Sequence, residues 1–149
     1  MDSQYIFLVI WFLLIFLIVF FFIRNGRKAL TIFPDLNSVK VLFQEKRVSG
    51  YSAKNWMTKM GGAQNVLEVI LTKNELWIRS NMLFAGFGTR YDLLHKTSLK
   101  QVKLLSAQDR SVVLEIRGND GMVRNIHLRI RKAQEFVLSM QHAKQEVNL

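Results

Sequence analysis

The sequence contains no cysteine and a single proline among its 149 residues. The lack of cysteine excludes a thiol nucleophile and a metal site built on thiolates, and it fits a reducing compartment. There is also no G-x-S-x-G motif, no phosphate-binding glycine-rich loop ending in Gly-Lys-Ser/Thr, and no carboxylate pair. The three histidines lie on separate predicted elements without metal-ligand spacing: His95, His127 and His142. From these absences we expect no enzyme, no cofactor and no metal.

Asp92, His95 and a nearby serine are a candidate catalytic group. Asp92 and His95 lie close enough in sequence to form a dyad with a serine such as Ser98. Residues 90–95 have a weak strand pattern, and side chains three positions apart on a strand point to opposite faces. We therefore expect that no dyad forms.

Acidic residues are scarce: 11 Asp and Glu stand against 21 Lys and Arg, a formal net charge of +10 at pH 7. Asp2 is the one acidic residue before position 24, so the rest of the chain carries +11. Anionic headgroups attract each juxtamembrane Lys or Arg by about 1 kcal/mol. Basic residues can also serve solubility alone or bind nucleic acid. No recognition helix or set of stacking aromatics accompanies the basic strands, so we expect anionic lipid and no nucleic acid.

One long apolar run is present, from Tyr5 to Ile23, without a charged residue, Gly, Pro or Ser. At ~1.5 Å per residue it forms a helix of roughly 28 Å, close to the hydrocarbon thickness of a bilayer. A cleavable signal peptide would have a basic start and a small-residue cleavage site, and this run has neither. A buried core helix of this length would include polar residues. We predict an uncleaved transmembrane anchor over residues 1–24.

Basic residues cluster on one side of this run, where Arg24, Arg27 and Lys28 follow it directly. Such residues stay on the cytoplasmic side of a span. We therefore expect the N-terminus outside and the rest of the chain on the cytoplasmic face of the inner (plasma) membrane. The run lacks a small-xxx-small pattern, so close helix dimerisation is not expected.

The remainder divides into a connection and one domain. Residues 25–37 contain Gly26 and the only proline, Pro34, and are predicted to form a juxtamembrane linker. Residues 38–149 are long enough for one domain with its own core, and not for two.

Within this domain the sequence alternates as antiparallel strands do. The clearest hairpins join 66–72 to 75–79 through Lys73-Asn74, and 111–117 to 122–130 through Gly118-Asn119-Asp120-Gly121. The second hairpin has one apolar and one polar face, which predicts a sheet with one solvated side. Its apolar positions are Val112, Leu114, Ile116, Ile126, Leu128 and Ile130. Weaker strand patterns cover 39–47, 50–60, 90–95 and 99–105.

The pattern changes to a helical period from Lys132 to Val147. The apolar stripe of this segment is Ala133, Phe136, Val137, Met140, Ala143 and Val147. We predict a mainly β domain, in which about seven antiparallel strands form an incomplete barrel whose open end is capped by this C-terminal α-helix.

Residues 65–78, Asn-Val-Leu-Glu-Val-Ile-Leu-Thr-Lys-Asn-Glu-Leu-Trp-Ile, resemble the strand–hairpin–strand of the pleckstrin-homology (PH) superfold, especially its GRAM-like and bacterial PH-like branches. Leu99 to Leu105 is similar to an I-x-x-V strand of those domains, and a last hairpin followed by the Phe136 helix also fits. Gly61-Gly62-Ala63 resembles uncharacterised bacterial proteins with one N-terminal span before a PH-like domain. The resemblance implies a PH-like fold over about 110 residues with a lipid-binding or protein-binding role.

The resemblance does not extend to a headgroup site. The phosphoinositide signature of the family, Lys-x-n-Lys/Arg-x-Arg in the first hairpin, has no clean match here. The basic residues in that region are Lys46, Arg47, Lys54 and Lys59.

Two surfaces are candidate contacts for lipid or for a protein partner. The first is basic, and its members beyond Arg24, Arg27 and Lys28 are Lys46, Arg47, Arg124, His127, Arg129 and Arg131. A basic strand face is also the ordinary state of a solvated edge hairpin. The second is 82–88, the most apolar segment after the span. As a loop it would present Leu83, Phe84 and Phe87 to a membrane interface or a partner, whereas as a strand with a bulge it would bury them.

A third apolar group, Trp56, Met57 and Met60, is suited in principle to an acyl or peptide groove. We expect it to pack under the sheet instead, as we do for Trp77, because such residues are usually buried.

Together these patterns predict a non-enzymatic, membrane-anchored binding module on the cytoplasmic side. It would contact an anionic membrane surface or a membrane-associated protein, which the anchor keeps at high effective concentration. The alternative is a structural subunit of a membrane protein complex, docked through Met82–Phe87 or a sheet edge.

Overall fold

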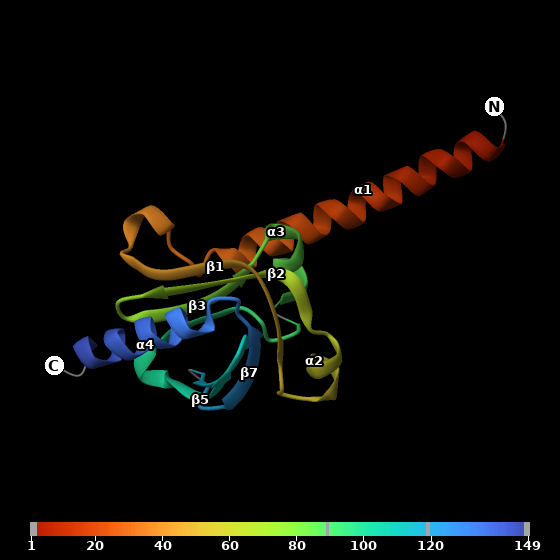
Figure 1. Ribbon diagram of the computed structural model, residues 1–149. Coiled ribbons are helices and arrows are strands. Elements are labelled where there is room, and N and C mark those ends of the chain that lie inside the picture. The colour runs from red at the N-terminus through yellow and green to blue at the C-terminus, as the bar shows by residue number, and fades with distance from the viewer. Residues whose placement is uncertain (1–2, 89, 119, 148–149) are drawn as a thin grey trace.

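The structure is a computed structural model that describes residues 3–88, 90–118 and 120–147 (Figure 1). A long helix, α1 (Ser3–Leu30), leads into seven strands with short helices between them, and helix α4 (Ala133–Val147) ends the chain. The strands are β1 (Val41–Ser52), β2 (Ala63–Thr72), β3 (Glu75–Ser80), β4 (His95–Ser98), β5 (Val102–Gln108), β6 (Ser111–Arg117) and β7 (Val123–Arg129). The short helices are η1 (Leu36–Ser38), α2 (Trp56–Met60), α3 (Met82–Gly88) and η2 (Leu99–Gln101).

Helix α1 is longer than the predicted span. It continues through the basic residues to Leu30, so residues 25–30 of the predicted linker are helical. The apolar part of α1 projects away from the sheet (Figure 1), and none of its most apolar 18-residue window is buried. Within the described residues, α1 is the one helix long and apolar enough to cross a membrane.

The seven strands form one antiparallel sheet in the order β4-β3-β2-β1-β7-β6-β5. Strand β1 pairs along its first part with β2 and at its end with β7, and Gly50 has partners on both sides. The register shifts at Arg47, whose φ is 60°, so β1 bends there and passes from one half of the sheet to the other. Strands β4 and β5 are the two edges, and the sheet is not closed. This order of strands followed by one helix is PH-like, as predicted.

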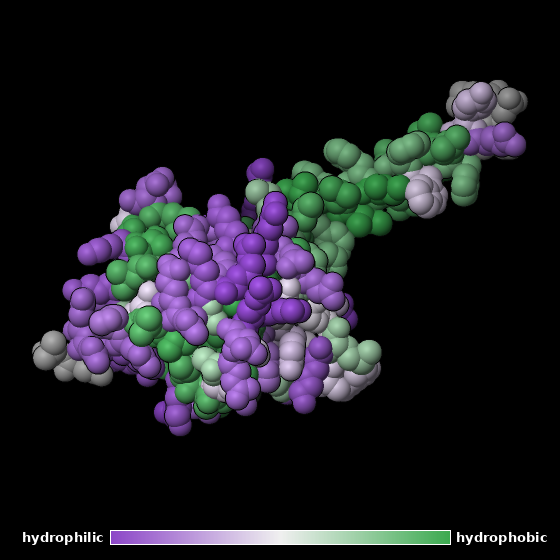
Figure 2. Space-filling view, in the orientation of Figure 1, coloured by the Kyte–Doolittle hydropathy of each residue, from purple (hydrophilic) through white to green (hydrophobic). Residues whose placement is uncertain are grey.

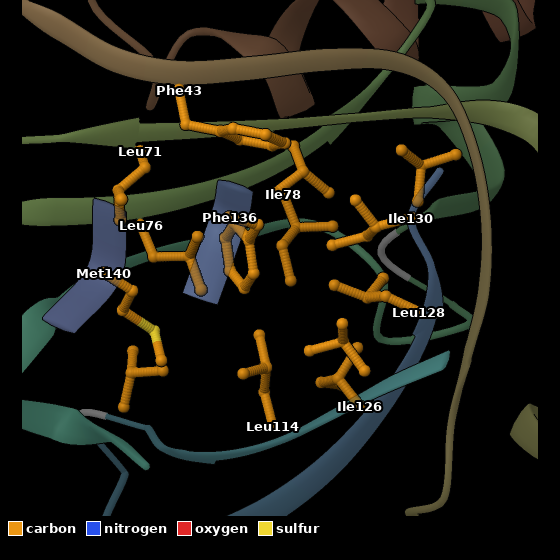
Figure 3. Packing of buried hydrophobic residues seen from close by; sticks show 14 of the residues in the cluster. Phe43, Leu71, Leu76, Ile78, Leu114, Ile126, Leu128, Ile130, Phe136 and Met140 are labelled. Carbon is orange, nitrogen blue, oxygen red and sulfur yellow. The ribbon is translucent and has the colours of Figure 1, made fainter. Parts of the chain in front are cut away.

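The core lies between the bent sheet and α4 (Figure 3). The inward positions of β6 and β7 are buried as the alternation predicts, and Phe136 and Met140 of α4 pack among them. The ring of Phe136 meets Phe43 of β1 edge-on, with 5.3 Å between centroids. The predicted hairpins β2–β3 and β6–β7 and the C-terminal helix are therefore confirmed; Asn119 of the second turn lies outside the described residues.

Two of the weaker strand predictions are wrong. Residues 50–60 do not form one strand, because β1 ends at Ser52 and α2 begins after Asn55. The Asn55 side chain accepts the N–H of Thr58 at 2.8 Å, and the Thr58 hydroxyl accepts the N–H of Asn55 at 3.0 Å, which is a capping box. Residues 90–95 are mostly turn, with Asp92 at φ 56°, and β4 begins only at His95.

A second, smaller core fastens the start of the chain to the outer face of the sheet. Phe33, just after α1, packs on Trp77 of β3 with 6.1 Å between ring centroids, and Ile70 of β2 lies beside them. Trp77 is fully buried, but in this second core and not under the sheet as predicted, and its Nε1 donates to Glu75 at 2.8 Å. Phe33 and Leu36 therefore attach the segment after α1 to the domain, and the segment is not a free tether.

Candidate functional site

The segment 82–88 is neither a loop nor a strand but helix α3. Asn81 begins it by accepting the N–H of Phe84 on its side chain at 2.9 Å. The helix lies against α1: the rings of Phe87 and Phe22 stack with centroids 4.2 Å apart. Both earlier interpretations of this segment are therefore wrong, because neither considered α1 as the packing partner of 82–88.

Two glycines make this helix contact close. A Cβ on Gly26 of α1 would collide with the Met82 carbonyl oxygen, and a Cβ on Gly86 of α3 would lie 3.1 Å from the Phe22 carbonyl oxygen. Small residues that let two helix backbones approach are typical of tight helix pairs. The part of α3 away from α1 stays exposed, with Leu83 at 54%, while Phe84 is half-buried against the main core.

The basic residues that follow the apolar run all lie on the exposed surface of α1. Arg24, Arg27 and Lys28 are on its last turns, and Met82 and Gly86 of α3 approach the same turns at Gly26. Cations near the C-terminus of a helix also interact favourably with its dipole. The positive end of α1 is thus held beside the apolar surface of α3.

Four arginines from three parts of the sheet line one open cleft. They are Arg47 at the bend of β1, Arg110 in the turn between β5 and β6, and Arg129 and Arg131 at and after the end of β7. Ser49, Gln64 and Asn65 complete the lining of this cleft, whose volume is about 770 Å³. Among the described residues, none that lines this cleft is acidic. We call this hollow, with its four arginines, the arginine cleft.

The arginine cleft has little internal charge compensation. Arg131 lies 3.6 Å from Glu45 (Nε to Oε1), but within the described part of the chain no ion pair involves Arg47, Arg110 or Arg129. All four arginine side chains are exposed. Several guanidinium groups around one hollow repel one another and attract an anion, and a guanidinium can bind phosphate or carboxylate oxygens bidentately. The arginine cleft is therefore suited to an anionic ligand.

The arginine cleft continues into two neighbouring hollows. One, of about 810 Å³, shares Arg110 and Arg129 and reaches Lys59 and His127. The His127 ring stacks on Tyr51, with 4.5 Å between centroids and 5° between planes. The other, of about 570 Å³, shares Arg47 and reaches Leu30 at the end of α1 and Met82 of α3. Adjoining hollows thus extend from Leu30 at the end of α1 along β1 to the arginine cleft, and Figure 2 shows the viewed face of the sheet domain as mainly hydrophilic beside the apolar α1.

The structure brings together most of the predicted basic residues. Arg47, Arg129 and Arg131 share the arginine cleft, and Lys46 and His127 line hollows beside it. Arg110 was not among the predicted residues. It follows Asp109, whose positive φ of 51° forms the tight turn that directs Arg110 to this place.

Arg124 does not belong to this surface. It is an even-numbered position of β7, on the same side as the buried Ile126 and Leu128, whereas His127 and Arg129 are odd-numbered. Its side chain is 11% exposed and forms ion pairs with Asp92, at 3.1 Å between Nε and Oδ2, and with Asp120. Arg124 is therefore paired inside the protein and is not free to contact a ligand.

Asp92 joins Arg124 to His95 and Ser52. The Ser52 hydroxyl donates to Asp92 Oδ2 at 3.0 Å, and His95 Nε2 lies 2.8 Å from the Asp92 carbonyl oxygen. Asp92 and His95 therefore do meet, contrary to the prediction, because Asp92 lies in a turn. Ser52 is fully buried and donates to the Asp92 carboxylate, whereas the serine of a hydrolytic triad is accessible and donates to the histidine. This network is therefore not arranged as a triad.

Burial and hydrogen bonding shift the pKa values of different groups in this network, and burial is the largest cause at His95. Burial lowers the pKa of His95, although the Asp92 carbonyl and carboxylate oppose the shift by favouring the charged ring. The hydrogen bond from the Arg124 guanidinium lowers the pKa of Asp120 to about 2. The same bond raises the pKa of Arg124. Within the described residues, no three His, Cys, Asp or Glu side chains are placed to hold a metal ion.

The third predicted group is on the surface and not under the sheet. Trp56, Met57 and Met60 of α2 are 71%, 47% and 78% exposed, and the buried residue of this helix is Thr58. The expectation of packing is therefore wrong, because the capping box makes 56–60 a short helix outside the sheet.

Comparisons with known proteins do not identify a family for this chain. No protein-family model matches the chain, and no curated protein matches its sequence. Among solved structures, the complex of PDZ-RhoGEF DH/PH domains with GTP-gamma-S activated RhoA is similar, with a TM-score of 0.47 and 14% sequence identity. The match covers 76% of this chain and 31% of that chain, so this protein spans less than a third of its length. At this distance the likeness carries nothing about activity, ligand or partner.

Proposed function

We propose that the protein is a single-pass membrane protein whose cytoplasmic PH-like domain binds anionic groups at the membrane surface without catalysis. One observation carries the proposal. An exposed apolar helix with a basic end packs on the sheet domain at Gly26, and a hollow that reaches Leu30 at this end adjoins the arginine cleft through Arg47. The basic residues Arg24, Arg27 and Lys28 would lie in the headgroup layer of the inner leaflet.

Two physical arguments support this function. An unburied helix of this length and composition is stable in hydrocarbon, where its backbone is satisfied internally, and costly to leave in water. Each basic residue held within a Debye length of an anionic surface adds about 1 kcal/mol of attraction. Because α1 is packed on the domain, the arginine cleft stays close to the headgroups.

The experiment is vesicle co-sedimentation of residues 29–149, a fragment that retains the packing of Leu30 and Phe33 on the sheet. We expect recovery with anionic vesicles at low salt and little recovery with neutral ones.

Replacing Arg47, Arg110 and Arg129 with Gln removes three charges from the arginine cleft and is expected to weaken binding at least tenfold. The matched control replaces Lys73, Lys100 and Lys103, which are exposed and lie outside the arginine cleft. Equal recovery with neutral and anionic vesicles would contradict lipid-surface binding.

The alternative, a structural subunit of a membrane complex, has one observation in its favour. The sheet is open, so β4 and β5 present unpaired edges to which a partner strand can add, and Leu83 of α3 is exposed. A photocrosslinker at position 83 in cells would discriminate between the two. Capture of one discrete protein favours the subunit, and capture of lipid favours the membrane-surface module.

A further inference from the structure

Helix α2 presents an apolar surface that nothing in the described chain covers. In its five residues, Trp56, Met57 and Met60 are all exposed, whereas Thr58 is buried and Gly61, which ends the helix, lies against the Tyr91 ring. Single exposed apolar residues are normal, but three on one short helix indicate a binding surface.

The position of α2 relates this surface to α1. Figure 1 shows α2 at the side of the domain toward which α1 projects, whereas α4 lies at the opposite side. Contacts link the two helices step by step. Gly61, which ends α2, lies so close to the Tyr91 ring that a Cβ would collide with it. The Tyr91 N–H donates to the Phe87 carbonyl at 3.2 Å, and the Phe87 ring stacks on Phe22 of α1.

The chemistry of α2 and its flanks fits a lipid headgroup layer. Tryptophan is enriched at membrane–water interfaces because its ring is apolar and its N–H is polar, and methionine side chains adapt to irregular apolar surroundings. Lys54 and Lys59 are exposed beside them, and no acidic residue occurs between Glu45 and Glu68. A short helix with apolar and basic side chains binds in the plane of an anionic interface.

We propose that α2 inserts into the interface of the same leaflet that receives the basic end of α1, with Trp56, Met57 and Met60 at the boundary of the acyl chains. This inference rests on the proposed function, since it requires α1 to span the bilayer. Attachment through both α1 and α2 fixes the tilt of the domain, and with it the angle at which the arginine cleft faces the headgroups. A freely tilting domain would lack this orientation.

The test uses the full chain, whose lack of cysteine allows single labelling sites. Met60→Cys, Leu17→Cys and Leu138→Cys are each labelled with an environment-sensitive fluorophore and reconstituted into nanodiscs of mixed neutral and anionic lipid. Leu17 lies in the apolar part of α1, and Leu138 is 57% exposed on α4. Spin labels on the acyl chains quench a fluorophore that enters the lipid.

We expect quenching at position 60 to approach that at position 17 and to exceed that at position 138 several-fold, with the same result for Met57→Cys. Quenching at 17 with none at 60 or 57 would overturn the insertion of α2 and leave the anchor intact. Absence of quenching at 17 would instead overturn the proposed function and this inference together. Since Met60 is 78% exposed, its replacement leaves the packing of the domain unchanged.

Discussion

Gly26 of α1 lies against the carbonyl group of Met82, so closely that no side chain fits between the two helices at this point. The backbones of the two helices are in contact here, so the direction in which α1 leaves the domain is set by its packing on α3. A flexible linker would let the helix and the domain reorient independently. Here the orientation of the domain follows from the orientation of α1.

Replacing Gly26 is therefore expected to separate α3 from α1. The measurement uses a Phe22→Cys, Phe87→Cys pair, whose parent rings stack at 4.2 Å, and a short bifunctional maleimide. We predict efficient crosslinking in this background and a several-fold loss when Gly26→Val is added, because its side chain collides with Met82. Arg27→Val, at an exposed neighbouring position, is the control and should retain the crosslink. Unchanged crosslinking in the Gly26 variant would show that the close contact does not exist.

The second core predicts that residues before 38 stabilise the domain. Phe33→Ala removes the ring that covers Trp77 and Ile70, and is expected to lower the free energy of unfolding by about 3 kcal/mol. Urea unfolding of the detergent-solubilised chain measures this change. Ile32→Ala, at a 49% exposed position, should stay within about 0.5 kcal/mol. Equal effects of the two substitutions would mean that Phe33 is not packed on the sheet.

Glu45 is expected to couple β1 to the start of α4. Its side chain is 6% exposed, and its carboxylate accepts the backbone N–H groups of Arg131 and Lys132 at 2.7 and 3.0 Å, just before α4 begins. Glu45→Ala leaves these donors without the acceptor, at a cost of about 2 kcal/mol in unfolding free energy. Glu135→Ala removes an exposed acid that pairs with Lys132, and should cost at most a few tenths of a kcal/mol by the same assay.

His95 is expected to make the domain less stable in mild acid. Because burial lowers its pKa in the folded state below the ordinary 6.5, the unfolded chain binds a proton first as the pH falls. The folded state is therefore favoured above pH 6.5 and loses stability as the pH drops from there toward the folded pKa. Asp92, Arg124 and Asp120 are the charged groups around the ring.

The measurement is the free energy of unfolding at pH 7.5 and pH 5.5. We predict that His95→Gln shows a smaller decrease between these values than the unsubstituted chain. His142→Gln, on the exposed surface of α4, should keep the full decrease. The same decrease in all three chains would contradict a role for His95.

The parts of the fold that the sequence predicts are those whose burial is decided locally. The alternation in β6 and β7 and the stripe of Phe136 and Met140 in α4 each repeat over several positions, so the buried face is evident before the partner is known. The same regularity shows why Arg124 faces inward. Arg124 is two positions before Ile126 on the same strand, so the two side chains lie on the same face. The prediction failed because it grouped Arg124 with the other basic residues by charge and not by its place in the alternation.

The remaining errors concern segments whose structure depends on a distant partner. Helix α3 is only seven residues long and is packed by Phe22, which lies some sixty positions earlier in the chain. Periodicity cannot identify so short a helix. Arg110 joins the arginine cleft through a tight turn at Asp109, which no strand pattern indicates. The exposure of Trp56 follows from a capping box that makes residues 56–60 a short helix, where the sequence pattern predicts a strand over 50–60.

Both proposals require that α1 spans the membrane, with the sheet domain on the side of its basic end. The most direct measurement is labelling of single cysteines at Gln4 and Asn74 with a membrane-impermeant maleimide, in intact and in permeabilised cells that produce the full chain. We predict that Gln4→Cys is labelled in intact cells and that Asn74→Cys is labelled only after permeabilisation. Labelling of Asn74→Cys in intact cells, or release of the chain from membranes by alkaline carbonate, would contradict the account.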